Sequence, residues 1–166
     1  QKLEISEYYE CHKELIEVVG TGYNSEIFCI DKERQKQKKA DRLRVIFAGK
    51  ISEKKGVKSL IRAMAKVSEI QEKNGKEAEL VLAGGYGEEE EFQTILQMTK
   101  ECPCQVRFLG RLAQRELAAE LNRSDVFVLP SFYEGLPLVV IEALACGLHT
   151  VCTELPGIGP WLQENI

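Results

Sequence analysis

Short apolar runs alternate with helical patterns of apolar residues from about Leu43 to the end of the chain. Five runs have the length and composition of buried strands, at residues 44–48, 79–83, 106–109, 125–129 and 148–152. Between them, apolar residues recur at the spacing of amphipathic helices. The runs are apolar on both faces, which indicates that helices cover each side of the sheet. The pattern predicts right-handed crossovers and a doubly wound parallel α/β sheet of the Rossmann-like class.

The first forty residues have a different pattern. Residues 15–19, Leu-Ile-Glu-Val-Val, predict an edge strand, and a glycine-containing turn follows it. Residues 31–44 carry seven bases and three acids, which is typical of a solvated linker, with an anionic partner as an open alternative. We therefore expect an interdomain segment at 1–42, with an edge strand and a basic linker, and a Rossmann-like domain at 43–166.

Composition narrows the classes of function. The chain has 166 residues, enough for one domain with its own core, and its 44% apolar and 29% charged content is typical of globular proteins. With 26 acids against 22 bases the net charge is −4, so we expect no nucleic-acid partner. A small phosphate remains possible, because an anion pocket needs only a few local charges.

Cysteine usage and the two ends of the chain add further expectations. No apolar run approaches the length of a membrane span. The six cysteines form neither a CxxC pair nor a metal-ligand cluster, so we interpret them as reduced thiols in a cytoplasmic protein without a bound metal. The chain starts with Gln1 rather than Met and stops soon after a Pro-Gly turn. We expect a fragment whose domain is truncated at its C-terminal end.

The stretch with the most chemistry lies at residues 130–147, where a strand, a glycine-containing loop and an apolar helix follow one another. Pro137 suits the first turn of that helix, and Glu142 is the only charged residue in it. An anion at the helix N-terminus would meet free N–H groups, and Glu142 lies about 7.5 Å further along at 1.5 Å per residue. Glu134 lies on the other side. The two carboxylates would bracket a diphosphate, although purely structural roles for both remain open.

A second candidate loop follows the first strand of the domain. Gly49 permits close approach of a ligand to the backbone, and Lys50 and Lys54 or Lys55 supply compact positive charges suited to phosphate. A charged surface loop is the alternative. Because the carboxyl ends of parallel strands share one edge of a sheet, this loop and residues 130–137 converge there. At the same edge, residues 84–88 form a glycine-rich turn lining the cleft, and Arg111 and Leu112 are placed to contact a nucleotide base.

Taken together, these residues resemble the nucleotide-sugar-binding half of the GT-B glycosyltransferases, specifically the large retaining family four. The resemblance covers roughly residues 16–166. Its motifs are residues 47–50, 55–56, 108–110, 124–131, 134–137 and 142–147, in the family's order and spacing. It implies one half of a GT-B fold, with the N-terminal acceptor domain and the last helix absent from this chain.

The resemblance also implies roles for individual residues. The first glutamate of the family's Glu-x7-Glu motif, here Glu134, contacts the donor sugar, and the second, here Glu142, binds the ribose. The amides of the Gly-Leu-Pro sequence, here Gly135 and Leu136, receive the diphosphate.

An Arg/Lys pair neutralises the diphosphate in that family. The matching positions here are Lys50 and Lys55, so a lysine stands where the family usually has arginine and bidentate phosphate binding is lost. The family works without a bound metal or permanent cofactor.

The function that we expect is donor binding in a retaining glycosyltransferase. The donor is a nucleoside diphosphate sugar, with a UDP-sugar favoured, and the hexosyl acceptor is a hydroxyl on a glycan, lipid or small molecule. The fragment alone would bind without turnover, and any membrane association would use the missing half. The alternatives are a non-catalytic nucleotide-sugar module or partner-dependent subunit, and a GT-B-like epimerase, which would consume no acceptor.

Overall fold

The computed structural model describes residues 2–17 and 22–154, and its centre is a five-stranded parallel sheet. The strand order is β3-β2-β1-β4-β5. The strands are β1 (Arg42–Ala48), β2 (Glu77–Ala83), β3 (Gln105–Gly110), β4 (Val126–Leu129) and β5 (His149–Cys152). All five strands predicted from the apolar runs are present, and β1 starts two residues earlier than expected.

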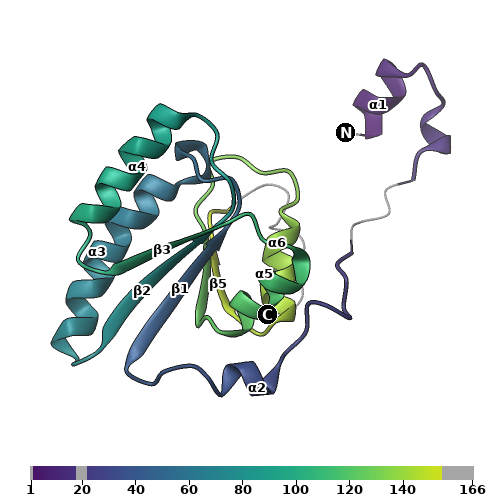
Figure 1. The fold of residues 1–166 in the computed structure, drawn as a ribbon. Coiled ribbons are helices and arrows are strands. Elements are labelled where there is room, and N and C mark those ends of the chain that lie inside the picture. The colour runs from purple at the N-terminus through teal and green to yellow at the C-terminus, as the bar shows by residue number, and fades with distance from the viewer. Residues whose placement is uncertain (1, 18–21, 155–166) are drawn as a thin grey trace.

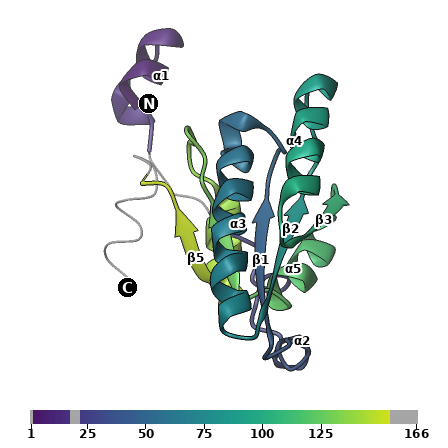
Figure 2. The same cartoon turned by 90° about the vertical axis from the view of Figure 1, so that its left-hand side faces the viewer.

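Helices cover both faces of this sheet (Figures 1 and 2). The longer pair, α3 (Val57–Lys73) and α4 (Glu89–Glu101), lies on one face, and α5 (Gln114–Asn122) and α6 (Leu138–Ala145) lie on the other. The described residues also contain α1 (Lys2–Tyr8), α2 (Lys32–Gln35) and the 3-10 turns η1 (Lys13–Leu15) and η2 (Glu53–Lys55). The predicted doubly wound α/β class is confirmed.

The core follows from the apolar patterns of β1, β2 and α3. Ile46 and Phe47 of β1 and Leu80 of β2 are fully buried, as strands covered on both faces require. The apolar stripe of α3 packs on them through Leu60 and Met64, which recur on one face of the helix.

The expected edge strand at residues 15–19 is wrong for the part that the structure describes. Leu15 ends η1 and is 78% exposed, and residues 16–17 pair with no strand, while residues 18–19 lie outside the described residues. A short apolar run forms a strand only where a sheet edge is available to pair with its backbone, and none of the described strands pairs with these residues.

Within the segment before residue 43, residues 28–35 pack on the domain instead of forming a solvated linker. Phe28 is 1% exposed and belongs to the core. The Asp31 N–H donates to Asn122 Oδ1 at 2.8 Å, and the Asn122 amide donates back to the Cys29 carbonyl at 2.9 Å. The Asp31 carboxylate also accepts from the first N–H groups of α2, which explains why this helix starts there.

Helix α6 is apolar along almost its whole length but is buried on only part of its surface. Val140 and Ala143 are buried against the sheet, but Leu138 is 42% exposed and Leu144 is 38% exposed. The sheet covers only one side of α6, so its uniform apolar composition overstated its burial.

Candidate functional site

A pocket of about 400 Å³ opens at the carboxyl edge of the sheet. Its walls come from the ends of β1, β2 and β3 and from the first turns of α5 and α6. The lining residues are Ala48, Gly49, Ala83, Gly84, Arg111, Leu112, Leu117 and Val139. Three residues predicted to bind the nucleotide, Gly49, Arg111 and Leu112, therefore meet in one mostly apolar cavity of the kind that holds small ligands.

Glycines at the ends of β1 and β2 let the two loops approach closely. The Gly49 N–H donates to the Ala83 carbonyl at 2.9 Å, and the Ile51 N–H donates to the Gly85 carbonyl at 2.9 Å. Gly84 has φ +141°, and a Cβ on it would lie 1.8 Å from the Gly49 carbonyl oxygen. Only glycine is compatible with this contact, so the backbone itself forms the pocket floor.

The same turn provides room for two cationic side chains. A Cβ on Gly87 would lie 2.7 Å from Lys50 Nζ, and a Cβ on Gly85 would lie 2.6 Å from Arg111 Nε. Lys50 and Arg111 are exposed, and neither forms an ion pair within residues 2–17 and 22–154. The sequence predicted that this turn lines the cleft, but not that it leaves room for both cations. The three glycines among residues 84–87 could have indicated this close approach of side chains.

Two of the predicted site residues contact each other. Lys55 Nζ donates to Glu134 Oε1 at 2.6 Å, with 28% and 13% of the two side chains exposed. The hydroxyl of Ser131, which is fully buried, donates to the same oxygen at 2.7 Å. Glu134 Oε2 makes no hydrogen bond within the described part of the chain. Sequence reasoning missed Ser131, although its place directly after Pro130 at a strand end was visible.

Backbone contacts hold the two loops together around this ion pair. The Phe132 N–H donates to the Lys54 carbonyl at 3.0 Å. Gly56, at φ +73°, lies so close to the other loop that a Cβ would stand 2.0 Å from the Pro130 carbonyl oxygen. The loops after β1 and β4 therefore lie against each other, as expected. The side chains that join them are Lys55 and Glu134, and Lys50 takes no part in this contact.

The N-terminus of α6 lies next along the chain. Pro137 is its N-cap residue and provides no side-chain cap, and Gly135 and Leu136 precede it. The eight-residue helix carries Glu142 on a half-buried face. Burial raises the pKa of the Glu142 carboxyl, and the side chain forms no hydrogen bond or ion pair with the described residues. A half-buried carboxylate without a partner is energetically unfavourable and is available to a ligand hydroxyl.

Acidic, histidine and cysteine side chains do not gather into groups of three or more that would suit a metal ion in residues 2–17 and 22–154. None of the helices described in this structure combines the length and the apolarity needed to cross a membrane.

Comparisons with known proteins agree with this fold. The family model for glycosyl transferases group 1 matches residues 30–165. An uncharacterised glycosyltransferase of Methanocaldococcus jannaschii is 30% identical over 126 residues, covering 76% of this chain and 31% of that protein. The amylovoran biosynthesis glycosyltransferase AmsK of Erwinia amylovora is 29% identical over 163 residues, covering 94% and 38%. The chain spans 27–39% of the length of the first curated relatives.

Solved structures give the same result. Sucrose-phosphate synthase from Thermosynechococcus elongatus superposes with a TM-score of 0.73 at 25% identity, covering 95% of this chain and 40% of that one. Anabaena HepE, solved in complex with UDP-glucose, has a TM-score of 0.70 at 24% identity, with coverage of 89% and 41%. The fold is thus the Rossmann-like half of a GT-B glycosyltransferase. More specifically, the chain belongs to the group 1 glycosyltransferase family.

Proposed function

We propose that this chain is the donor-binding domain of a retaining glycosyltransferase that transfers a hexosyl group from a UDP-sugar to an acceptor hydroxyl. The observation that carries the proposal is the convergence at the carboxyl edge. An apolar pocket, the exposed cations Lys50 and Arg111, the Lys55–Glu134 pair and the start of α6 lie at this edge, and Glu142 follows on α6. The acceptor site belongs to the other half of the full-length enzyme in this proposal.

The diphosphate binds between the two loops and the start of α6. Lys55 has three N–H donors, of which one is used by Glu134, so the remaining donors can bind phosphate oxygens without breaking the ion pair. Lys50 adds a second charge from the Gly87 side, and the N–H groups after Pro137 add the positive end of the helix dipole. These groups stabilise negative charge on the leaving diphosphate during transfer.

The sugar and the nucleoside then bind at opposite ends of the diphosphate. Glu134 Oε1 is held by Ser131 and Lys55, so Oε2 is the oxygen that accepts hydrogen bonds from donor-sugar hydroxyls. The nucleoside extends toward the apolar pocket, where Arg111 and Leu112 contact the base and Glu142 accepts from the ribose hydroxyls. The complexes of HepE with UDP and with UDP-glucose support uracil as the base.

Transfer with retention requires no protein base in this half. The acceptor hydroxyl attacks from the face on which the diphosphate leaves, and the departing phosphate oxygen accepts its proton. Lys50 and Lys55 hold that diphosphate in place, and Glu134 orients the sugar ring. The chemistry therefore rests on electrostatic stabilisation and positioning.

Calorimetric titration of this chain with UDP, GDP, ADP and UDP-glucose tests the proposal. We expect UDP and UDP-glucose to bind, and a ligand at 100 times its Kd to stabilise the fold by about 2.7 kcal/mol. Glu142→Ala and Lys55→Ala should weaken binding, whereas Lys100→Ala, an exposed change on α4, should leave it unchanged. If no diphosphate binds, or if all three variants lose affinity equally, the donor-site assignment is wrong.

A further inference from the structure

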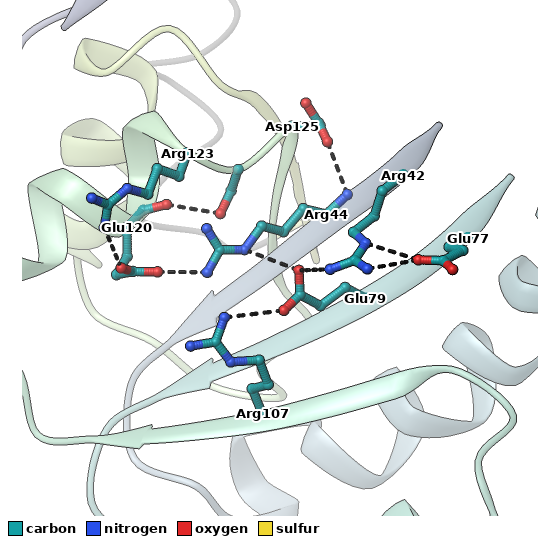
Figure 3. A network of polar contacts seen from close by, with 9 residues as sticks. Arg42, Arg44, Glu77, Glu79, Arg107, Glu120, Arg123 and Asp125 are labelled. Atoms are coloured by element: carbon teal, nitrogen blue, oxygen red, sulfur yellow. Dashed lines mark hydrogen bonds and ion pairs between the residues drawn. The ribbon is translucent and has the colours of Figure 1, made fainter. Parts of the chain in front are cut away.

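A second charged cluster lies at the opposite, amino edge of the same sheet (Figure 3). Arg42 and Arg44 are two residues apart on β1, so their side chains share one face of the sheet. Their register partners on β2 are Glu77 and Glu79, and Arg107 reaches the cluster from β3. These residues form cross-strand ion pairs at the amino ends of three neighbouring strands.

One buried carboxylate organises this cluster. Glu79 is 3% exposed, and three guanidinium groups lie around it. Arg42 Nη1 is 3.5 Å and Arg44 Nε is 3.4 Å from Oε2, and Arg107 Nη1 is 3.3 Å from Oε1. Arg42 and Arg44 also pair with Glu77 and Glu120 at 2.6 Å, so an excess of positive charge has to come from the other bases around these pairs.

The excess charge lines a cavity of about 160 Å³. The lining residues are Gln37, Lys38, Lys39, Arg42, Arg44, Glu79, Arg107, Arg123 and Asp125, six bases and two acids. Two more acids, Glu77 and Glu120, lie outside the lining but form ion pairs with arginines that belong to it. With them, the cluster contains four acidic residues. Six positive charges therefore face four negative ones, in a chain whose net charge is −4.

Several donors of the cluster are unused within the described residues. The buried Nε of Arg44 forms no hydrogen bond, although it lies near Glu79. Lys39 is exposed and takes part in no ion pair in that part of the chain. Arg107, which lines the cavity, is 47% exposed and uses only one guanidinium nitrogen on Glu79, so its other nitrogens remain available as donors. Unused guanidinium and ammonium donors are the groups that bind phosphate oxygens.

We propose that this pocket binds a phosphate dianion, either inorganic phosphate or the phosphate group of a small monoester. The pocket is less than half the size of the 400 Å³ cavity at the carboxyl edge, so it suits one phosphate group rather than a nucleotide. Glu79 and Asp125 are the negative groups that face such an anion, and both are already engaged by arginine or lysine. The site gives the basic run at 31–44 an anionic partner and does not depend on the proposed transferase function.

Two-dimensional ¹⁵N NMR titration of this chain with inorganic phosphate and with glycerol 1-phosphate, at constant ionic strength in chloride, tests the site. We expect saturable shifts at the amides of residues 38–44 and 107. Lys39→Gln and Arg107→Gln should each weaken phosphate binding by about fivefold or more, since each removes a charged donor. The Arg107 side chain is 47% exposed, and Lys39 is an exposed residue in a loop, so both variants should fold.

A matched control variant locates the phosphate. Lys100→Gln changes an exposed lysine on α4, outside both charged sites, and should leave phosphate affinity unchanged. Comparable Kd values for the two ligands would show that the phosphate group alone is recognised, and tighter binding of the ester would identify monoesters as the source. Shifts that never saturate, shifts confined to the carboxyl edge, or affinity in Lys39→Gln and Arg107→Gln no weaker than in Lys100→Gln would overturn the proposal.

Discussion

The ion pair between Lys55 and Glu134 should couple the loops after β1 and β4 energetically. The perturbation is a double-mutant cycle of Lys55→Met, Glu134→Gln and the double variant, with Lys58→Met and Glu53→Gln as a control pair. The control ion pair spans 2.7 Å, against 2.6 Å for Lys55–Glu134, but its Glu53 side chain is 61% exposed. Both pairs involve the loop after β1, but the control pair is local and more exposed, and it does not reach the loop after β4.

The expected coupling follows from the exposure of the pair. With 28% and 13% of the side chains exposed, Lys55 and Glu134 lie between surface pairs, worth about 0.2–1 kcal/mol, and buried pairs, whose disruption costs about 3–5 kcal/mol. We therefore expect a coupling of about 1–2 kcal/mol. Ser131 keeps its hydrogen bond to Glu134 when Lys55 is replaced, which limits the loss.

Urea unfolding of the four chains in each cycle measures the coupling. The Lys55–Glu134 double variant should be about as stable as the less stable single variant, because the second change removes no further interaction. The control pair should show a smaller coupling that vanishes in high salt. Additive losses for Lys55 and Glu134, within about 0.3 kcal/mol, would refute the reasoning that this ion pair joins the two loops.

Three further predictions concern stability. Gly84→Ala places a Cβ 1.8 Å from a backbone oxygen at φ +141° and should lower the free energy of unfolding by about 2–4 kcal/mol, measured by thermal unfolding. The control Gly75→Ala, at φ +67° with open space around it, should lower it by about 1 kcal/mol. Equal losses would contradict the close contact at Gly84. Burial raises the pKa of Glu142 above its ordinary 4.5, so the folded chain binds that proton more tightly and stability falls as pH rises through this range. Glu142→Gln should therefore be more stable than the parent chain at pH 7 and equal to it at pH 4 in urea unfolding, and the opposite trend would refute the burial argument. Phe28→Ala should cost about 3–5 kcal/mol, and Leu15→Ala less than about 0.5 kcal/mol, by urea unfolding; a neutral Phe28→Ala would exclude it from the core.

The fold could be predicted from the sequence because buried strands and amphipathic helices leave periodic patterns. All five strands and the four helices that cover the sheet lie where the apolar residues place them. The edge strand at 15–19 failed because pairing depends on a neighbouring strand, which a local pattern does not reveal. The packing of the segment around Phe28 was missed for a related reason, since the hydrogen bond that holds this segment joins Asp31 and Asn122, which are 91 positions apart.

The candidate site was predictable as a set of residues but not as a set of contacts. Parallel topology brings Gly49, Arg111 and Leu112 to one pocket. The choice of Glu134 as the partner of Lys55 depends on a three-dimensional distance, and no spacing in the sequence specifies it. Buried Ser131 escaped notice because an isolated serine after a strand is common in loops.

The central claim is that the carboxyl edge of the sheet holds a nucleoside diphosphate sugar. The most direct measurement is a two-dimensional ¹⁵N NMR titration of this chain with UDP and then with UDP-glucose. We predict saturable shifts at the amides of residues 49–55, 84–87, 110–112, 134–136 and 138–139, with the sugar adding further shifts around Glu134. Shifts confined to the amino edge, or none at saturating ligand, would contradict the account.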